Sequence, residues 1–482
     1  MTYMKKVNLL DWLFFLGLFL VFLIPPTDPD LGWQLRCGQE IWQNHTLCSQ
    51  NHFSVLLSDY SWPNHRWLYQ SLLFPIYQIF NLWGLTFFNA LLLTAAFFFF
   101  YHSIRNFNFE KRVAIIMTTL FSASVFSLGI RNQLPGLLFL TLILWTYSKT
   151  KTNVKYLFLY PPIMLLWANF HGSFVLGLIL IACFIAVGGI NCFVNHHQIR
   201  LFPLLILLLS TLITLVNPFG IRIYEEAWRH IGEVNLSKLI AEWVPPGIET
   251  WLLVFGTSAA LFFWLLFKNP RQQKLLAFLL FPFTYLALSA RRNLPYFFLV
   301  AFFLFLTSPA TQKLMHDFLA RQNLRKYLSL ALSLLLLAIG LTISLPHSWR
   351  TNRSWQDFCL ASPLNFPCSA VEYLKSQASG NIFNRYEWGG FLIWQLPQDK
   401  VFVDGRMPAW PTSSGKSPYT IFLEILQTQP GWNESLKEYG IDWILINPGT
   451  FMDLLLKDDP PKYGWEEKYR DEISVVYRRV EK

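Results

Sequence analysis

The chain has 482 residues, of which 53% are hydrophobic and only 14% are charged, and its formal net charge is +10. A soluble globular domain has about 25% charged residues, so this composition excludes an ordinary soluble protein. The excess positive charge does not by itself indicate nucleic-acid binding, and we expect no nucleic acid among the partners, because the basic residues follow a membrane topology instead.

Apolar runs of about 20 residues recur along the chain, and each is long enough to cross a bilayer core of about 30 Å. We therefore predict an α-helical polytopic membrane protein with about eleven transmembrane helices. The predicted spans are 8–24, 82–101, 113–130, 134–148, 155–170, 173–191, 201–216, 251–267, 274–289, 294–308 and 327–345. The first run is interpreted as a retained helix, because Leu23-Ile24-Pro25-Pro26 offers no small-residue cleavage site for a signal peptidase.

Basic residues gather in every second loop, beginning with Lys5 and Lys6 and continuing with pairs such as Lys149 and Lys151. Under the positive-inside rule these loops are cytoplasmic. The predicted location is therefore the cell (inner or plasma) membrane, crossed several times, with the N-terminus in the cytoplasm. An odd number of spans places the C-terminal part outside.

Two domains are expected. Residues 1–345 form the transmembrane domain, which includes a long first outer loop at 25–81, and residues 346–482 form an extracytoplasmic α/β domain. The second domain alternates strand-like and helix-like segments. The strand-like ones are 400–404, 442–447 and 473–477, and the helix-like ones are 369–376 and 419–426.

Four of the six cysteines fall in predicted outer segments, as two pairs close in sequence. Cys37 and Cys48 share the first outer loop, and Cys359 and Cys368 share the start of the C-terminal domain. An oxidising compartment favours disulfides, so we predict one in each pair. Four buried free thiols are the alternative.

Two carboxylates, Asp28 and Asp30, directly follow the first apolar run. Paired carboxylates repel each other, so they tend to hold a cation, accept a proton or meet a partner. We expect one of them, with a slight preference for Asp30, to be a general base, and the pair could also hold a divalent cation, Mg²⁺ or Mn²⁺. No other cofactor is indicated.

Further polar residues are predicted on the same outer side of the membrane. Four cationic or proton-donating groups suit the oxygens of a donor phosphate, and these are Arg131, His171, Arg291 and Arg292. Seven residues are candidate contacts for an acceptor or a sugar, namely Trp33, His65, Arg66, Glu242, Trp388, Asp404 and Arg406. For the last three a structural role is the alternative: turn chemistry, and an Asp–Arg ion pair that fixes the C-terminal domain to the helices.

An acidic pair directly after the first helix, in a long outer loop, resembles the GT-C superfamily of polytopic glycosyltransferases. Four segments are similar to a group of bacterial membrane proteins related to the mannosyltransferase-like members. They are Asp28-Pro-Asp-Leu-Gly-Trp, Trp167-Ala-Asn-Phe-His-Gly-Ser, Trp388-Gly-Gly-Phe-Leu-Ile-Trp and Phe402-Val-Asp-Gly-Arg406. The resemblance implies a polyprenyl-phosphate-linked sugar as donor, and Asp28 or Asp30 as the catalytic base.

The leading hypothesis is therefore a glycosyltransferase that moves a hexosyl or pentosyl group to a glycan, lipid or protein acceptor outside the membrane. The alternatives are a transporter or flippase for lipid-linked glycans and a non-catalytic membrane assembly protein. The chain shows no internal repeat and almost no charge at the centres of its helices, which disfavours a transporter.

Overall fold

The computed structural model describes residues 9–107, 109–127, 134–196, 198, 201–232, 240, 242–318, 322–361 and 365–480. The chain forms two compact units, and each combines segments that are distant in sequence. Unit 1 contains 1–24, 86–221 and 237–347, and unit 2 contains 25–85, 222–236 and 348–482. The first outer loop therefore shares a unit with the C-terminal residues.

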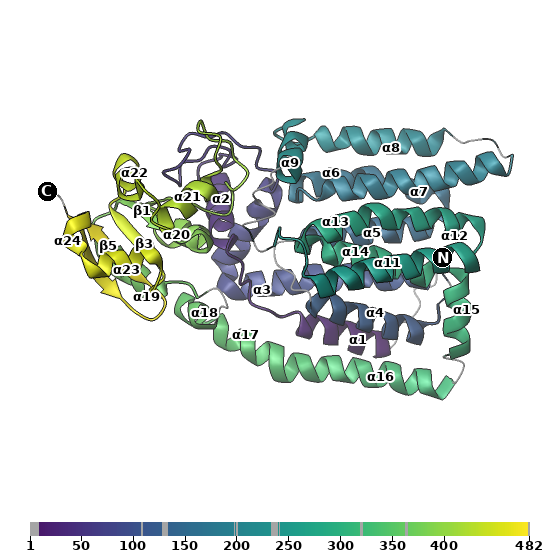
Figure 1. Ribbon diagram of the computed structural model, residues 1–482. Helices are drawn as coiled ribbons and strands as arrows, with labels where there is room; N and C mark the ends of the chain where they lie inside the picture. Colours follow the sequence, from purple (N-terminus) through teal and green to yellow (C-terminus); the bar gives the residue numbers. More distant parts are fainter. Residues whose placement is uncertain are drawn as a thin grey trace. The chain divides into compact units, whose positions relative to one another are not determined.

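Unit 1 is helical (Figure 1). Its helices are α1 (Leu9–Val21), the second half of α3 (Trp67–Arg105), α4 (Lys111–Ser127), α5 (Leu134–Thr150), α6 (Tyr160–Phe170), α7 (Phe174–Val194), α8 (Phe202–Leu212), α11 (Ile248–Lys268), α12 (Arg271–Leu276), α13 (Leu280–Ser289), α14 (Leu294–Thr307), α15 (Pro309–Phe318), α16 (Gln322–Ile339) and the start of α17 (Leu345–Thr351). Each of the eleven predicted spans overlaps one or more of these helices.

Small residues bring two of these helices into close contact. A Cβ on Gly17 of α1 would lie 2.9 Å from Cβ of Leu336 in α16, and one on Gly340 would lie 2.4 Å from Cβ of Leu20. Glycine at such crossings lets backbones approach, which drives helix association in lipid.

Four described helices are long and apolar enough to cross a membrane: Trp67–Arg105, Phe174–Val194, Ile248–Phe267 and Leu324–Thr351. A fifth span is formed if Arg291–Thr307 and Pro309–Met315, bent by 76°, are one segment. Further apolar helices at Leu9–Val21, Phe202–Leu215 and Gln273–Ser289 are shorter. The count of eleven spans therefore stays a prediction.

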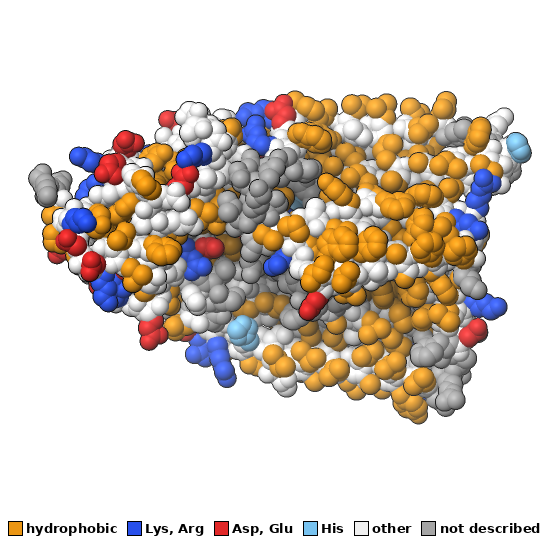
Figure 2. All heavy atoms as spheres, in the orientation of Figure 1, with side chains coloured by type: hydrophobic (Ala, Val, Ile, Leu, Met, Phe, Trp, Pro, Cys, Tyr) orange, Lys and Arg blue, Asp and Glu red, His pale blue; other side chains and the backbone are white. Residues whose placement is uncertain are grey.

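On the face shown in Figure 2, apolar side chains cover much of the helical unit 1. On α8 alone, Leu204, Leu205, Leu208 and Leu212 are each about half exposed. Leucines on the outer face of a helix are expected where the surrounding solvent is lipid.

Unit 2 contains a mixed sheet with the strand order β2-β1-β3-β5-β4. Its strands are β1 (Asn381–Asn384), β2 (Lys400–Val401), β3 (Trp443–Ile446), β4 (Trp465–Arg470) and β5 (Val475–Arg479). Strands β2, β1 and β3 are parallel, whereas β5 runs antiparallel to both β3 and β4. All four residues of β3 are buried, so the apolar core of this unit lies along the centre of the sheet.

The helices of unit 2 come from all three segments of its sequence. They are α2 (Leu31–Gln43), the first part of α3, α9 (Arg222–Gly232), α18 (Trp355–Ala361), α19 (Cys368–Lys375), α20 (Gly389–Gln395), α21 (Pro418–Leu426), α22 (Trp432–Glu438), α23 (Phe451–Asp458) and α24 (Pro460–Tyr463). The predicted helices 369–376 and 419–426 are confirmed as α19 and α21. Strand 400–404 is shorter than predicted, because after Val401 the chain turns through Asp404-Gly405-Arg406.

The first outer loop adds to this sheet. The N–H of Val55 donates to the carbonyl of Val401 at 2.8 Å, and the N–H of Val401 donates to the carbonyl of Phe53 at 3.0 Å. The segment 53–55 therefore pairs in parallel with β2, at the edge of the sheet. This pairing covers backbone groups of an edge strand that would otherwise be left open.

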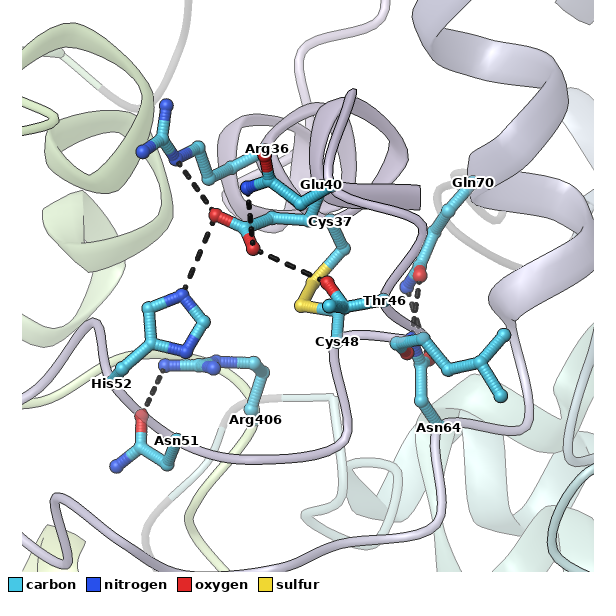
Figure 3. The surroundings of a disulfide bond; sticks show 12 residues. Arg36, Cys37, Glu40, Thr46, Cys48, Asn51, His52, Asn64, Gln70 and Arg406 are labelled. Carbon is cyan, nitrogen blue, oxygen red and sulfur yellow. Dashed lines mark hydrogen bonds and ion pairs between the residues drawn. A yellow bond between two sulfur atoms is a disulfide. The ribbon is translucent and has the colours of Figure 1, made fainter. Parts of the chain in front are cut away.

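Both predicted disulfides are confirmed: Cys37 is bonded to Cys48, and Cys359 to Cys368. The first joins the middle of α2 to the loop that follows this helix. Beside it lies Glu40, whose carboxylate is 3.5 Å from Nε2 of His52 and 3.8 Å from Nε of Arg36 (Figure 3). The hydrogen bond from His52 lowers the pKa of Glu40 below its ordinary value.

We expect unreduced, denatured protein to react with a thiol-specific alkylating reagent only at Cys183 and Cys192, which are free cysteines. The other four become reactive only after reduction. Peptide mass spectrometry measures this, and alkylation of Cys37 or Cys359 without reductant would contradict the assignment.

Candidate active site

The acidic segment forms the turn that starts α2. Oδ1 of Asp28 accepts a hydrogen bond from the N–H of Asp30 at 2.9 Å, an Asx-turn in which the side chain replaces a backbone acceptor. Asp30 occupies the N-cap position of α2, but its side chain makes no capping hydrogen bond. The two carboxylates therefore differ: Asp28 shapes the backbone, and Asp30 is directed elsewhere.

The carboxylate of Asp30 lies between a cation and a glycine. Its Oδ2 is 3.8 Å from Nη1 of Arg66. Its Oδ1 lies 2.0 Å from the point where a Cβ on Gly405 would be. The Arg66 guanidinium also lies 5.9 Å from the ring centre of Trp33. The Asp30 and Arg66 side chains are 18% and 15% exposed, so the pair is partly shielded from water and still accessible.

A fully buried ion pair flanks Gly405. The guanidinium of Arg406 donates to both carboxylate oxygens of Asp404, through Nε and Nη2 at 2.7 Å each, and both side chains have no exposed surface. Arg406 also donates to Asn51 and Ser54, and the Ser54 hydroxyl donates to Asp404 at 2.8 Å. Burial alone would raise the pKa of Asp404, but Arg406 and Ser54 outweigh it and hold the pKa below its ordinary value.

Glycines allow the remaining close approaches. A Cβ on Gly32 of α2 would lie 2.0 Å from the carbonyl oxygen of Gly390 in α20, and one on Gly390 would lie 2.3 Å from the carbonyl oxygen of Pro29. A Cβ on Gly389 would lie 2.2 Å from the carbonyl oxygen of Val403. Any side chain at these positions would force backbones apart, so the segments meet only because they lack one.

Three of the four segments that carry the family resemblance therefore meet in unit 2. They are 28–33, 388–394 and 402–406. Residues 385–390 and 402–406 follow the carboxyl ends of the parallel strands β1 and β2, which is the edge where open α/β sheets place their ligands. The indole N–H of Trp388, itself fully buried, donates to the carbonyl of Asn365 at 3.1 Å.

The fourth segment, 167–173, lies in unit 1. Oγ of Ser173 accepts from the indole N–H of Trp167 at 3.1 Å and lies 2.7 Å from Nδ1 of His171, which also accepts from the N–H of Ser173 at 3.1 Å. Since Nδ1 accepts from the backbone, the neutral ring of His171 carries its proton on Nε2. His171 is therefore a buried donor between α6 and α7.

Arg291 and Arg292, also in unit 1, lie in a short 3-10 turn before α14. Nη1 of Arg292 is 3.0 Å from Oε1 of Glu242, and its guanidinium lies 4.2 Å from the ring centre of Trp243. The backbone N–H of Arg291 donates to the carbonyl of Val244, and its side chain is exposed. Glu242 is thus a partner of the predicted phosphate-binding Arg292.

The predicted site residues fall into two groups. Asp28, Asp30, Trp33, Arg66, Trp388, Asp404 and Arg406 lie together in unit 2, as does His65, whose backbone N–H donates to Pro63. His171, Glu242, Arg291 and Arg292 belong to unit 1, so the convergence of the two groups stays a prediction. Arg131 lies outside the described residues. Among the residues that the structure describes, no three His, Cys, Asp or Glu side chains form a group that could hold a metal ion.

Sequence reasoning missed Asn51, Ser54 and Gly405. Asn51 and Ser54 are ordinary loop residues, and nothing in their sequence context indicates an ion pair whose hydrogen-bonded partners lie 350 and 355 positions away. Gly405 lies within 402–406, one of the segments that carry the family resemblance. A glycine between two charged residues is, however, equally typical of a simple turn.

No protein-family model matches the sequence, and no curated protein matches it significantly. Solved structures do match. The oligosaccharyltransferase from Archaeoglobus fulgidus in the apo form has a TM-score of 0.59, with 12% identity over 100% of this chain and 75% of that one. The same enzyme in complex with an inhibitory peptide and a dolichol-phosphate has a TM-score of 0.53, with 12% identity over 99% and 75%. The same enzyme tethered with an acceptor peptide containing the NVT sequon has a TM-score of 0.51, with 12% identity over 99% of this chain and 75% of that one. At this identity the likeness concerns the fold.

We expect Asp404→Asn to destabilise the protein by about 3–5 kcal/mol, because it leaves Arg406 buried without a counter-charge. The stabilisation that Asp404 gives is complete above its unfolded pKa of about 3.9 and is lost as the pH falls through the lower folded pKa. Thermal unfolding in detergent as a function of pH measures both effects.

The control is Lys416→Ala, which removes an exposed pair with Glu424 and should change stability by less than about 1 kcal/mol. An Asp404→Asn variant as stable as this control would contradict the importance of the buried pair.

Proposed function

Because this chain has the fold of the GT-C superfamily of polytopic glycosyltransferases, we propose that it is a membrane glycosyltransferase. It transfers a sugar from a polyprenyl-phosphate-linked donor to an acceptor outside the membrane. The observation that carries this proposal is the Asp30 carboxylate, held partly shielded between Arg66 and Gly405 where three motif segments meet.

Asp30 acts as the general base. It takes the proton of an acceptor hydroxyl as that oxygen attacks the anomeric carbon of the donor sugar. The bond between the anomeric carbon and the phosphate oxygen breaks, and polyprenyl phosphate leaves with the electron pair. A single displacement of this kind inverts the anomeric configuration. Arg66 lies 3.8 Å away and forms an ion pair with this carboxylate.

Asp28 has a different role in this proposal. One of its carboxylate oxygens accepts the N–H of Asp30, so it fixes the backbone from which the base projects. Should the enzyme use Mg²⁺ or Mn²⁺, Asp28 and Asp30 would hold the ion, with water and donor phosphate as the remaining oxygen ligands. The ion would offset charge on the departing phosphate.

His171, Arg291 and Arg292 are the proposed donors to the phosphate, together with Arg131. The Nε2–H of His171 and the guanidinium groups all donate hydrogen bonds, as a phosphate requires. Arg292 is held by Glu242 and Trp243, which limits its motion. The archaeal oligosaccharyltransferase with a similar fold has been solved in complex with a dolichol-phosphate. This supports a polyprenyl-phosphate carrier here.

Of the proposed acceptor contacts in unit 2, Arg66 and His65 are partly exposed, and we assign the acceptor to them and to Asp30. Asp404, Arg406 and Trp388 have almost no exposed surface, so their proposed role is to support the site. Trp33 is 3% exposed and supports Arg66 through its ring. The proposed orientation places this unit outside the membrane and the N-terminus in the cytoplasm.

We expect Asp30→Asn to lower the transfer rate by about 10²–10⁴-fold, because an amide cannot accept the proton. Asp28→Asn is the matched control for a reaction that needs no metal ion: an asparagine oxygen still accepts the N–H of residue 30, so the turn is kept and most of the activity remains. An enzyme that needs the ion would lose activity in both variants. The assay is incubation of purified protein with radiolabelled polyprenyl-phosphate sugars and membrane extract as acceptor. Full activity of Asp30→Asn would eliminate Asp30 as the base.

A further inference from the structure

We propose that Gly405 is a positioning residue for the Asp30 carboxylate, so that the turn Asp404-Gly405-Arg406 is part of the active-site construction. This inference rests on the proposed function for the role of Asp30. The contact itself is independent of that function, because it follows from the geometry alone.

The two oxygens of Asp30 have different neighbours. A Cβ on Gly405 would lie 2.0 Å from Oδ1, 3.1 Å from Cγ and 3.7 Å from Oδ2 of Asp30, and these are the three nearest atoms. Oδ2 is the oxygen that faces Arg66 at 3.8 Å. One oxygen therefore rests on the α-carbon of Gly405, and this contact sets the direction in which the other one points.

The turn that carries Gly405 is fixed from behind. Asp404 and Arg406 on either side form the fully buried pair, with hydrogen bonds to Asn51 and Ser54. On another side, a Cβ on Gly389 would lie 2.7 Å from Cβ of Asp404, so the backbones are already in contact. The turn has no room to move away from Asp30, and the carboxylate has to adapt to it.

A methyl group at position 405 would consequently rotate the Asp30 carboxylate rather than displace the turn. Rotation takes Oδ2 away from Arg66 and from the position in which it meets the acceptor. A misplacement of about 1 Å at a reacting group can lower a rate about a hundredfold.

The kinetic test compares Gly405→Ala with the wild-type protein in the radiolabelled polyprenyl-phosphate sugar assay. We expect kcat to fall about a hundredfold and KM for the donor to stay within about twofold. The control is Gly256→Ala, where an added Cβ would meet nothing within 4 Å, and which should leave both unchanged. A Gly405→Ala enzyme with wild-type kcat would overturn the proposal.

The structural test is a double-mutant cycle read by thermal unfolding. Asp30→Ala removes all three atoms that a Cβ at 405 would meet, so Gly405→Ala should lower the apparent Tm by about 3 °C in the wild-type background and by nothing in the Asp30→Ala background. Gly390→Ala is the matched control, because its Cβ would meet the backbone oxygen of Pro29 and Asp30→Ala cannot relieve that contact. Equal destabilisation by Gly405→Ala in both backgrounds would overturn the contact.

The two tests separate the two proposals. If Asp30→Asn keeps full activity, the proposed base is wrong, while the double-mutant cycle still reports the contact. If Asp30→Asn is inactive and Gly405→Ala is fully active, the base assignment is supported and the positioning role is overturned. If Gly405→Ala fails to fold, folding of Asp30→Ala/Gly405→Ala supports the contact, and its failure to fold counts against it.

Discussion

The organisation of unit 2 depends on the buried ion pair between Asp404 and Arg406. Two charges without any exposed surface are costly unless every polar atom around them is paired. Here the first outer loop supplies much of that pairing through Asn51 and Ser54, while Phe53 lies under the guanidinium, with its ring centre 5.0 Å away. Among the described residues, Nη1 of Arg406 has no hydrogen-bond partner. The first outer loop and the C-terminal domain are thus held together by hydrogen bonds that neither segment could form alone.

The glycines of the site are explained by the same arrangement. Once segment 53–55 pairs with β2 and Asp404 is buried beside it, the acidic turn and the start of α20 come close to the end of β2. Backbone then meets backbone at Gly32 and Gly390, and a side chain meets backbone at Gly405. Each motif combines a glycine with a polar or aromatic residue. The glycine allows the close approach, and the polar or aromatic residue supplies the side chain.

Local patterns in the sequence predicted what depends on near neighbours. The apolar runs marked the helices, the outer cysteines lie nine and eleven residues apart and are bonded, and α19, α21 and β3 lie close to their predicted bounds. Strands β1 and β4 were not predicted, because Asn381–Asn384 is short and Trp465–Arg470 is mostly polar. The strand character of β1 comes from long-range pairing with β3, which leaves no periodic signal, and that of β4 comes from pairing with β5, the next strand along the chain.

The sequence could also indicate which residue types gather on one face, but it could not divide them into roles. Asp404 and Arg406 were predicted both as acceptor contacts and, alternatively, as an ion pair, and only their burial and mutual hydrogen bonds favour the second role. The same alternative proposed that the pair fixes the C-terminal domain to the helices, whereas its described partners belong to the first outer loop. Long-range partners decide such questions, and they are set by the fold.

The division of roles between Asp28 and Asp30 follows from one hydrogen bond. A carboxylate that accepts the backbone N–H two residues later is tied to the turn, and Asp28 does so at 2.9 Å. Asp30 sits at the N-cap of α2 without capping it, although capping would contribute about 1 kcal/mol. Its carboxylate is directed instead toward Arg66 and Gly405. Asp30 therefore forms a partly shielded ion pair instead of a capping hydrogen bond. A catalytic role explains this arrangement better than a contribution to the stability of α2 does.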